Sequence, residues 1–374
     1  MVSLLDEHHG YLSLAGRSEI YGQAIEALLR PGDVVADLGC GVGVLGLQCL
    51  QAGAARAYGI DYSDAIELAR ETMARAGLSD RYTCIRNSTY RAQLPEQVDL
   101  IICDHVGYFG FDYGIVEMMA DARRRLLKPG GRTIPQAVAP VVAGVSSAEC
   151  LEQASWWAED DFPEEYHWLN TYARNTKHTA MFKPDDLCSA PVTLGSVRLD
   201  REDGEASAMA GTLVATRDCR FDGLGGWFEC EMAPGVTMTN SPLAEPRIDR
   251  NHVFLPCEQA FDVKAGDEIA VALRFRHDGE MIAWDVTPPG GAPRQRMSTW
   301  KSKVLTPADL VAEKDTPLSL NPTGTARRVI LSLVDGMRSA AEIEALVMEQ
   351  HNDLFPNPAE LRRFVRRELG HAAQ

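Results

Sequence analysis

Residues 18–145 alternate short aliphatic runs with segments of helical periodicity, and this alternation limits the possible folds more than any other feature of the chain. The aliphatic runs are VVADLG, RAYGI, YTCIRN and VDLIICD, and the helical patterns between them include VLGLQCLQAG and AIELARETMARAG. Strands that alternate with helices at this spacing predict a mostly parallel, doubly wound sheet. We therefore expect an α/β domain in the first part of the chain.

Two further regimes of composition follow. From about residue 146 to 290, runs such as PVTLGSVRLD and EIAVALRFRHDGEMIAWDV are separated by Gly, Pro and Asp, which predicts an antiparallel β domain. From about residue 316, apolar residues recur at helical spacing in three segments, which predicts a small helical module. At 374 residues the chain exceeds the usual size of a single core, so we expect domains at 1–137, 138–295 and 310–374.

The bulk properties argue against several classes of partner. The formal net charge of −16 disfavours a nucleic-acid backbone, whose phosphates need a basic surface. The nine cysteines form no CxxC pair and no cluster with histidine at zinc spacing, so we expect no metal site and a reducing, cytoplasmic setting. No segment approaches the about 20 apolar residues that cross a bilayer, so we expect no membrane partner.

A glycine-rich turn follows the first aliphatic run. Gly39, Gly41 and Gly43 let a ligand approach the backbone closely, and the helix after them offers free N–H groups to polar ligand atoms. The third glycine follows the second after one residue rather than two, which departs from the dinucleotide-binding spacing. Asp61, at the end of the next aliphatic run, is placed to accept hydrogen bonds from ribose hydroxyls. The alternative for Asp61 is a helix N-cap, a role that Ser63 can fill instead.

Glycines in the pattern G-x-G-x-G, with a ribose-binding acid one strand later, resemble the S-adenosylmethionine-dependent methyltransferases of the Rossmann-like type. The resemblance then narrows to the protein arginine methyltransferase family. It is carried by VVADLGCGVGVLGLQCLQAGAARAYGID, LPEQVDLIICDHVGYF and RRLLKPGGRTIPQAVAPVVAGV, and in the second domain by WFECEM, NSPLAEP and VFLPCEQAFDVKAGDEI. It covers roughly residues 5–290 and implies an α/β, Rossmann-like methyltransferase domain, then an antiparallel β-barrel substrate domain, with S-adenosylmethionine as cofactor.

The same resemblance implies a set of cofactor-binding residues. Asp61 would hold the ribose, and Arg17 would pair with the methionine carboxylate unless it is a surface arginine of the first helix. Tyr11 would cover the bound cofactor. Where the family has an acid that receives the adenine amino group, this sequence has Tyr90, with Ser88 nearby. The complete expected set is Tyr11, Arg17, Asp37, Gly39, Gly41, Gly43, Asp61, Ser88 and Tyr90.

The stretch LIICDHVGYFGFDYG, residues 100–114, corresponds to the family's acceptor loop, in which two glutamates fork onto a substrate guanidinium. The first glutamate matches Asp104, which is one methylene shorter, and the second matches Tyr113. Asp112 lies one residue too early for the second position. The family's Thr-His-Trp motif falls on residues 247–249, which are Arg-Ile-Asp, although His252 is close by. The acceptor side of the family pattern is therefore altered.

Three interpretations follow from the altered loop. In the first, Asp104 and Asp112 re-form a guanidinium clamp, and an arginine-like substrate is kept. In the second, the pocket is rebuilt for another nitrogen or oxygen acceptor, with Asp104 or His105 as base and Tyr108 or Tyr113 orienting the substrate. In the third, the domain binds a peptide without methyl transfer. The changes cluster on the acceptor side while the glycine loop and the ribose acid persist, which favours the second interpretation.

The tail sequence LNPTGTARRVILSLVDGMRSAAEIEALVMEQ resembles the PqqD-like modules, small winged-helix domains that bind the leader segment of ribosomally made peptides. Strand addition would hold such a leader while the cleft modifies a core residue. Packing of the tail on the β domain or on a second subunit is the alternative. The acidic, tryptophan-rich segment from Trp156 to Trp168 takes the place of the family's dimerisation arm, near residues 151–175, so we expect a head-to-tail homodimer.

Together these features predict an enzyme that methylates a heteroatom, with nitrogen favoured over oxygen. The expected substrate is a peptide or a small specialised metabolite. The residues expected to carry the chemistry are Asp104, His105, Asp112 and Tyr113.

Overall fold

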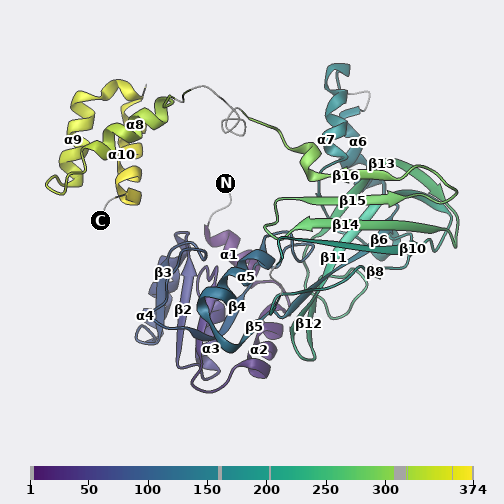
Figure 1. Cartoon of the computed structure of the whole chain (residues 1–374), viewed down its shortest axis with the longest axis horizontal. Coiled ribbons are helices and arrows are strands. Elements are labelled where there is room, and N and C mark those ends of the chain that lie inside the picture. Colours follow the sequence, from purple (N-terminus) through teal and green to yellow (C-terminus); the bar gives the residue numbers. More distant parts are fainter. Residues whose placement is uncertain are drawn as a thin grey trace. The chain divides into compact units, whose positions relative to one another are not determined.

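The computed structural model describes residues 4–158, 162–201, 204–306, 317, 319–355 and 357–372. The chain divides into two compact units, Met1–Lys303 and Val304–Gln374. The first unit contains the α/β and β domains, and the second contains the C-terminal helices (Figure 1). Residues 159–161 of the predicted dimerisation arm and residues 310–316 of the predicted tail module lie outside the described residues.

The α/β domain is built on a parallel sheet, as the alternating sequence pattern predicts. Its described strands are β1 (Val34–Leu38), β2 (Arg56–Asp61), β3 (Tyr82–Arg86), β4 (Val98–Cys103) and β5 (Leu127–Ile134). They lie in the order β3-β2-β1-β4-β5, and their neighbouring pairs are parallel. The direction of winding reverses between β1 and β4, so the loops after these two strands diverge and leave a crevice at the carboxyl ends of the strands. Side chains in these loops are therefore placed to meet a ligand.

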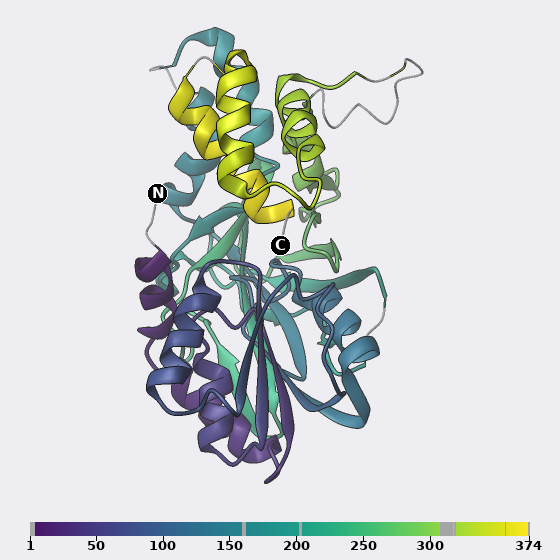
Figure 2. The same ribbon diagram turned by 90° about the vertical axis from the view of Figure 1, so that its left-hand side faces the viewer.

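Helices cover both faces of this sheet (Figure 2). They are α2 (Arg17–Leu28), α3 (Val44–Gln51), α4 (Ala65–Arg75) and α5 (Ile115–Leu126), and α1 (Leu4–Leu12) precedes them. Right-handed crossovers put α3 and α4 on one face and α5 on the other, because the chain moves across the sheet in opposite directions before and after β3. Leu38, Ile60 and Ile101 are fully buried in the core that the sheet and helices share. The aliphatic runs of the sequence thus form the rigid base beneath the crevice.

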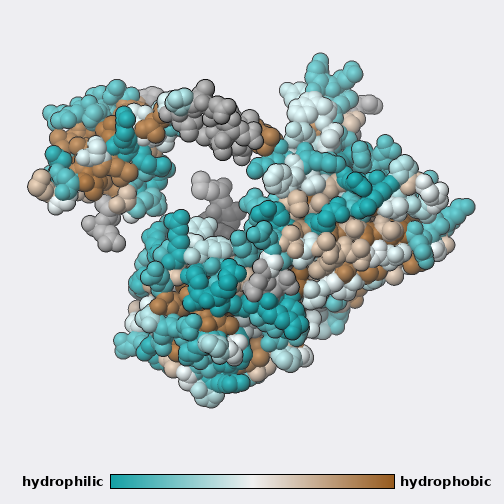
Figure 3. All heavy atoms as spheres, viewed as in Figure 1, coloured by the Kyte–Doolittle hydropathy of each residue, from teal (hydrophilic) through white to brown (hydrophobic). Residues whose placement is uncertain are grey.

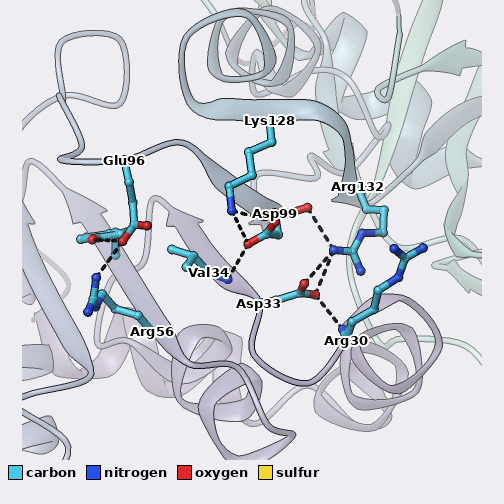
Figure 4. Close-up of polar contacts among 9 residues, drawn as sticks. Arg30, Asp33, Val34, Arg56, Glu96, Asp99, Lys128 and Arg132 are labelled. Atoms are coloured by element: carbon cyan, nitrogen blue, oxygen red, sulfur yellow. Dashed lines mark hydrogen bonds and ion pairs between the residues drawn. The ribbon is translucent and has the colours of Figure 1, made fainter.

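A polar network ties the strands together at their amino ends, away from the crevice (Figure 4). The Asp99 carboxylate, on β4, accepts a hydrogen bond of 2.9 Å from the Val34 amide on β1 and another of 2.9 Å from the Lys128 ammonium on β5. Arg132, also on β5, donates to the Asp33 carboxylate at 3.0 Å. These contacts hold β1, β4 and β5 in register with groups that take no part in the crevice.

The β domain is antiparallel, as predicted. Its described strands are β6 (Ala137–Val145), β7 (His178–Ala180), β8 (Val192–Thr193), β9 (Val197–Arg198), β10 (Ala206–Val214), β11 (Cys219–Ala233), β12 (Val236–Thr239), β13 (His252–Val263), β14 (Glu268–Arg276), β15 (Ile282–Thr287) and β16 (Gln295–Ser298). One sheet has the order β7-β13-β11-β6-β8, with β12 on β11 and β9 on β6, and the other has the order β10-β14-β15-β16. Trp227 and Trp284 are buried, and the Trp284 indole donates to the Pro256 carbonyl at 2.8 Å.

A helical arm interrupts the β domain between β6 and β7. It comprises α6 (Ala148–Ser155), η1 (Trp156–Ala158), η2 (Glu164–Leu169) and α7 (Asn170–Ala173), and Figure 1 shows it projecting from the sheets. Short 3₁₀ turns, η3 (Pro184–Asp186) and η4 (Thr299–Ser302), occur elsewhere in the domain. Trp156 and Trp168 on the arm are 47% and 59% exposed. Large aromatic side chains at this exposure are costly in water, which makes the arm a surface suited to a partner.

The second unit is helical, as the apolar periodicity predicts. Its described elements are α8 (Pro322–Ser332), α9 (Ala340–Gln350), η6 (Asn352–Leu354) and α10 (Pro358–Ala372), and no strand occurs among residues 319–355 and 357–372. Asn321 caps α8 by accepting the Gly324 amide at 2.7 Å, while Ile330, Val347 and Phe364 meet in its core. Hydrophobic residues also lie at the surface of this unit, in addition to those in its core (Figure 3). Within the described part of the chain, no helix has the length and apolar character that crossing a bilayer requires.

Candidate active site

The glycine loop between β1 and α3 and the acid at the end of β2 form one hydrogen-bonded unit. Gly39, Gly41 and Gly43 have φ angles of +64°, +52° and +86°, which are left-handed conformations that favour glycine. The Asp61 carboxylate accepts hydrogen bonds of 2.8 Å from the amides of Gly41 and Ser63. The side chain is therefore fixed at the end of β2, directly beside the loop.

A cavity of about 310 Å³, which we call the main cleft, opens above this loop. It is bounded by α1, by the loop after β4 and by one segment of the β domain. The predicted residues in its described lining are Tyr11, Arg17, Asp37, Gly39, Gly41, Asp61, Asp104, His105 and Tyr113. The predicted residues Gly43, Ser88, Tyr90 and Asp112 do not contribute to that lining. The fold thus brings together residues that are up to about a hundred positions apart in the sequence.

Asp37, on β1, is a buried acid at the floor of the main cleft. Its Oδ2 accepts a hydrogen bond of 2.9 Å from the Gly46 amide in α3 and a longer one of 3.4 Å from the Tyr82 hydroxyl. Burial raises the pKa of Asp37 to about 7, although the Gly46 amide opposes the rise. These contacts fix the start of α3 against β1, which sets the position of the glycine loop.

Arg17, at the start of α2, is 5% exposed and is only partly satisfied. Its Nη2 pairs with the Asp104 carboxylate, whereas Nε and Nη1 are buried and have no hydrogen-bond partner among the described residues. Buried donors in native proteins are nearly always paired, so these two N–H groups are positioned for an acceptor from a ligand.

Asp104 follows the last residue of β4 and faces the main cleft. Besides Arg17, its carboxylate accepts a hydrogen bond of 2.7 Å from the Tyr21 hydroxyl, which also donates to the Cys103 carbonyl at 3.1 Å. Two donors from α2 thus hold the carboxylate in place. A carboxylate that is held this way is an orienting group more readily than a mobile base.

His105, the next residue, lies against the glycine loop. A Cβ placed on Gly39 would approach the His105 ring to 3.0 Å, and one placed on Gly41 would approach the His8 ring to 2.6 Å. Burial lowers the pKa of His105, and the neighbouring Asp104 opposes the change only in part. The imidazole is therefore neutral near pH 7 and able to accept a proton.

Asp112 points away from the main cleft. Its side chain is fully buried, its Oδ1 accepts the Phe109 amide at 2.9 Å, and its Oδ2 pairs with Lys177, which follows the helical arm. A Cβ on Gly107 would lie 1.9 Å from Oδ1, so only glycine fits beside the carboxylate. Asp112 therefore braces the acceptor loop, and its placement does not favour a two-carboxylate clamp with Asp104.

The β domain holds the acceptor loop from the other side. Asn240 is fully buried, and its Nδ2 donates to the carbonyls of Tyr108 at 3.0 Å and Asn251 at 2.8 Å, while its Oδ1 accepts the Phe228 amide at 3.0 Å. The rings of Tyr108 and Tyr113 lie 5.7 Å apart at the edge of the cleft. The loop is thus a fixed frame that carries Asp104, His105 and the two tyrosines.

Two other sequence expectations fall outside the cleft. The Tyr90 hydroxyl donates to Glu117 at 3.2 Å, and Tyr90 lines a separate hollow instead of the main cleft. His252 is buried on β13, where Nδ1 accepts the Phe182 amide at 2.9 Å and Nε2 lies 2.7 Å from the Asn240 carbonyl. Both ring nitrogens of His252 are thus engaged in holding the β domain together.

Comparisons with known proteins find methyltransferases among the relatives of this chain. The family pattern of a methyltransferase domain matches residues 35–131. An arginine N(omega)-methyltransferase of Streptomyces achromogenes subsp. streptozoticus is 28% identical over 273 residues, which cover 71% of this chain and 75% of the relative. The protein is an S-adenosylmethionine-dependent methyltransferase. A probable protein arginine N-methyltransferase 6 of Arabidopsis thaliana is 36% identical over 141 residues, 37% of this chain and 32% of the relative, so that alignment spans about a third of the relative's length.

Solved structures share the fold of the methyltransferase. The Trypanosoma brucei PRMT1 enzyme-prozyme heterotetrameric complex with AdoHcy matches with a TM-score of 0.70 and 21% identity, over 78% of this chain and 97% of that chain. Protein Arginine Methyltransferase 10 of Arabidopsis thaliana matches with a TM-score of 0.65 and 20% identity, over 77% of this chain and 96% of that chain. The order of a Rossmann-like domain and an antiparallel β domain is therefore that of the arginine methyltransferases, which the methyltransferase resembles.

Arg250 is a charged residue of the main cleft that was not among the residues predicted from the sequence. Arg250, just before β13, is 6% exposed, and its guanidinium carbon lies 5.5 Å, 5.3 Å and 5.9 Å from the ring centroids of Tyr11, Tyr108 and Tyr113. The available signal was its place in RIDRNH, one residue after the altered Thr-His-Trp position. Among the described residues, no group of three or more His, Cys, Asp or Glu side chains is arranged to hold a metal ion.

Proposed function

We propose that the methyltransferase methylates a heteroatom, with nitrogen favoured over oxygen, in a peptide or a small specialised metabolite that is not held by a two-carboxylate clamp. The observation that carries this proposal is the division between the two acids of the acceptor loop. Asp104 faces the main cleft and is held by Arg17, whereas Asp112 is buried against Lys177. A substrate guanidinium would therefore meet a single carboxylate that is already paired with Arg17. It would not be bound between two free carboxylates, as the family's clamp requires.

The residues of the main cleft fit the cofactor. The unpartnered Nε and Nη1 of Arg17 suit the methionine carboxylate, Asp61 suits the ribose hydroxyls, and the left-handed backbone of Gly39 and Gly41 lets the ligand lie close to the loop. When bound, S-adenosylmethionine supplies a methyl group on a positively charged sulfur, open to in-line displacement by a lone pair of the acceptor. Tyr11, on α1, lines the same cleft and would cover the ligand when it is bound.

Within this cleft we assign His105 as the base that accepts the proton released by the methyl acceptor. The imidazole is held neutral by burial, lies beside the glycine loop and lines the cleft together with Asp104. Asp104 is bound by Arg17 and Tyr21, so its role is to orient the acceptor. Tyr113 completes the wall and presents its ring to the acceptor. A neutral base at this place removes the proton that a nitrogen or oxygen acceptor loses on methylation.

Methylation of a guanidino group is the second candidate, and the relatives favour it. The Streptomyces relative is an arginine N(omega)-methyltransferase, and it aligns over most of this chain. For this enzyme to form the family's clamp, Asp112 would have to leave both Lys177 and the Phe109 amide. That rearrangement would leave the Lys177 ammonium, whose side chain is 25% exposed, without its carboxylate partner, which is why we place this candidate second.

Three further properties are proposed from other parts of the molecule. The exposed Trp156 and Trp168 on the arm support a head-to-tail homodimer. All nine cysteines lie in the described residues and are free thiols, which supports a reducing, cytoplasmic setting. Peptide capture by a PqqD-like module rests on the tail sequence alone, with structural packing as the alternative, because residues 319–355 and 357–372 contain no strand to which a peptide could be added.

The test is a titration followed by a survey of acceptors. Calorimetry of the purified protein with S-adenosylmethionine, beside an Asp61→Ala variant, reports cofactor binding. Free arginine, an arginine-rich peptide and a co-encoded candidate peptide are then offered under mass spectrometry. We expect binding that depends on Asp61 and methylation of an acceptor other than the two arginine substrates. Methylation of free arginine would move the second candidate to first place, and absence of binding would overturn the cofactor assignment.

A further inference from the structure

Arg250 is a buried cation whose charge no described side chain neutralises. It lines both the main cleft and a neighbouring cavity of about 320 Å³, which we call the side cavity. Its contacts among the described residues are three tyrosine rings, and none of these supplies a carboxylate. Arg17, the other buried arginine of the main cleft, is by contrast paired with Asp104. Arg250 is therefore the arginine of the cleft lining that has no ion-pair partner among the described residues.

The tyrosine rings support this charge without satisfying its hydrogen-bonding groups. A guanidinium near aromatic faces gains from the ring quadrupole, so Tyr11, Tyr108 and Tyr113 stabilise the cation. The guanidinium nevertheless has five N–H donors in a planar fork, and an aromatic face accepts such bonds only weakly. Unlike the Arg17 donors, the Arg250 nitrogens are not among the buried, unpartnered atoms of the described residues, so they are accessible from the two cavities and can donate to a ligand there. An oxyanion supplied by a ligand completes this arrangement.

The charges nearby do not provide that oxyanion. Lys177 lies 5.7 Å from the centroid of the Tyr113 ring, but Asp112 already neutralises it. Asp249 and Asp6 line the side cavity, yet both are exposed, so water and salt screen them far more than they screen Arg250. Asp37, Asp61 and Asp104 line the main cleft with Arg250, but Asp104 is paired with Arg17, and among the described residues none of the three forms an ion pair with Arg250.

We propose that Arg250 is the anion-binding residue of the acceptor site, and that the methyl acceptor carries a carboxylate. This inference rests on the proposed function and names the substrate class of the same site. A carboxylate matches the planar fork of the guanidinium and balances its single charge, whereas a doubly charged phosphate monoester would leave an excess of negative charge. The body of the acceptor lies in the side cavity, against Tyr11, Leu14, Tyr108 and Met181. A volume of about 320 Å³ suits a small molecule or one side chain of a peptide.

Three probes of the same shape test the charge preference directly. Benzoate, benzamide and benzamidine are titrated by ligand-observed NMR into the full-length protein that is saturated with S-adenosylhomocysteine. We expect benzoate to bind at least about tenfold more tightly than benzamide, and benzamidine to bind most weakly, because Arg250 attracts the anion and repels the cation. This measurement requires no turnover and no knowledge of the natural acceptor.

Variants then assign the preference to Arg250. In Arg250→Gln the advantage of benzoate over benzamide should disappear, while in Arg250→Lys it should persist in part. Arg247→Gln is the matched control, because Arg247 is three positions away and its side-chain hydrogen bonds among the described residues go to the Pro242 carbonyl and the Glu245 carboxylate. Arg247→Gln should leave the affinities for all three probes unchanged. Circular dichroism checks that each variant is folded. If Arg250→Gln does not fold, the order of the three affinities in the unmodified protein tests the carboxylate site.

The outcomes separate this inference from the proposed function. Equal affinities for benzoate and benzamide, or tightest binding of benzamidine, would overturn the carboxylate site even if methyl transfer is confirmed. A loss of S-adenosylmethionine affinity in Arg250→Gln that exceeds the loss for benzoate would also overturn it, since Arg250 would then serve the cofactor. If calorimetry shows that the unmodified protein does not bind S-adenosylmethionine, the proposed function itself would be overturned.

Discussion

Replacement of Arg17 by methionine separates the two roles that the structure gives this residue. Methionine keeps an apolar stem of similar length but removes every N–H donor. The variant loses the Nε and Nη1 donors that suit the cofactor carboxylate, and it also strands the Asp104 carboxylate. Hydrogen bonds to a charged group contribute about 1.5–3 kcal/mol, so the Kd for S-adenosylmethionine should rise about 10- to 150-fold.

The cost to stability follows from the burial of the ion pair. Breaking a buried pair by removing one partner destabilises a protein by about 3–5 kcal/mol when the remaining charge is fully buried. The Asp104 side chain is 16% exposed and keeps its 2.7 Å hydrogen bond from Tyr21. The free energy of unfolding of Arg17→Met should therefore fall by the smaller amount of about 2–3 kcal/mol.

A double variant resolves the two effects. Arg17→Met with Asp104→Asn removes the stranded charge, so its stability should return to within about 1 kcal/mol of the unmodified protein. Its affinity for S-adenosylmethionine should stay low, because the donors are still missing. Urea denaturation gives the stability and calorimetry gives the affinity. If Arg17→Met binds the cofactor as tightly as the unmodified protein does, the unpartnered donors have been misread and Arg17 serves only to hold Asp104.

Three further changes test other parts of the structure. The pKa of His105 is lowered from its ordinary value of about 6.5, so kcat/KM of the unmodified enzyme should fall as the pH drops through that lowered pKa, because the base becomes protonated. His105→Gln should remove this fall on the acid side of the pH profile. Asp112→Asn should cost about 1–3 kcal/mol of stability, measured by urea denaturation, by unpairing Lys177, and should leave methyl transfer within about threefold, whereas a guanidinium clamp requires near-complete loss. Burial raises the pKa of Asp99, and Lys128 and the nearby backbone amide lower it by more, so the net shift is downward. The stability from Asp99 is therefore present above its unfolded pKa of about 3.9 and is lost as the pH falls through the lower folded value. Asp99→Asn should lower the free energy of unfolding by about 1 kcal/mol at pH 7 and by nearly nothing at pH 2. Thermal melts at the two pH values measure this difference. An equal loss of stability at both pH values would contradict the ionic origin of the effect.

The framework of the site was predictable because it depends on local sequence patterns. The parallel sheet follows from alternating strands and helices, and a crevice at the carboxyl ends of the strands follows from the sheet. Residues at the ends of those strands or just after them, such as Asp61, Asp104 and His105, therefore reach the main cleft as expected. Gly39 and Gly41 line the cleft as well, and both have left-handed φ angles.

What the sequence could not predict depends on contacts between distant segments. Asp112 lies one position from Tyr113, yet it turns away from the cleft because Lys177, from the far side of the helical arm, pairs with it. Arg250 reaches the cleft only because the β domain folds back over the acceptor loop. Ser88 and Tyr90 were expected in the cleft because they match a family position, but neither lines it. Tyr90, in the segment between β3 and β4, instead lines a separate hollow and donates a hydrogen bond to Glu117.

Asn240 gives this enzyme a way to change its substrate without changing its architecture. One buried amide side chain fixes the carbonyl of Tyr108 in the acceptor loop and the carbonyl of Asn251, which adjoins Arg250. The two walls of the acceptor site are thereby spaced by main-chain contacts that are independent of the side chains facing the ligand. Substitution of the Tyr108 or Arg250 side chain should therefore leave the spacing between the two walls unchanged, because Asn240 binds main-chain carbonyls on both sides.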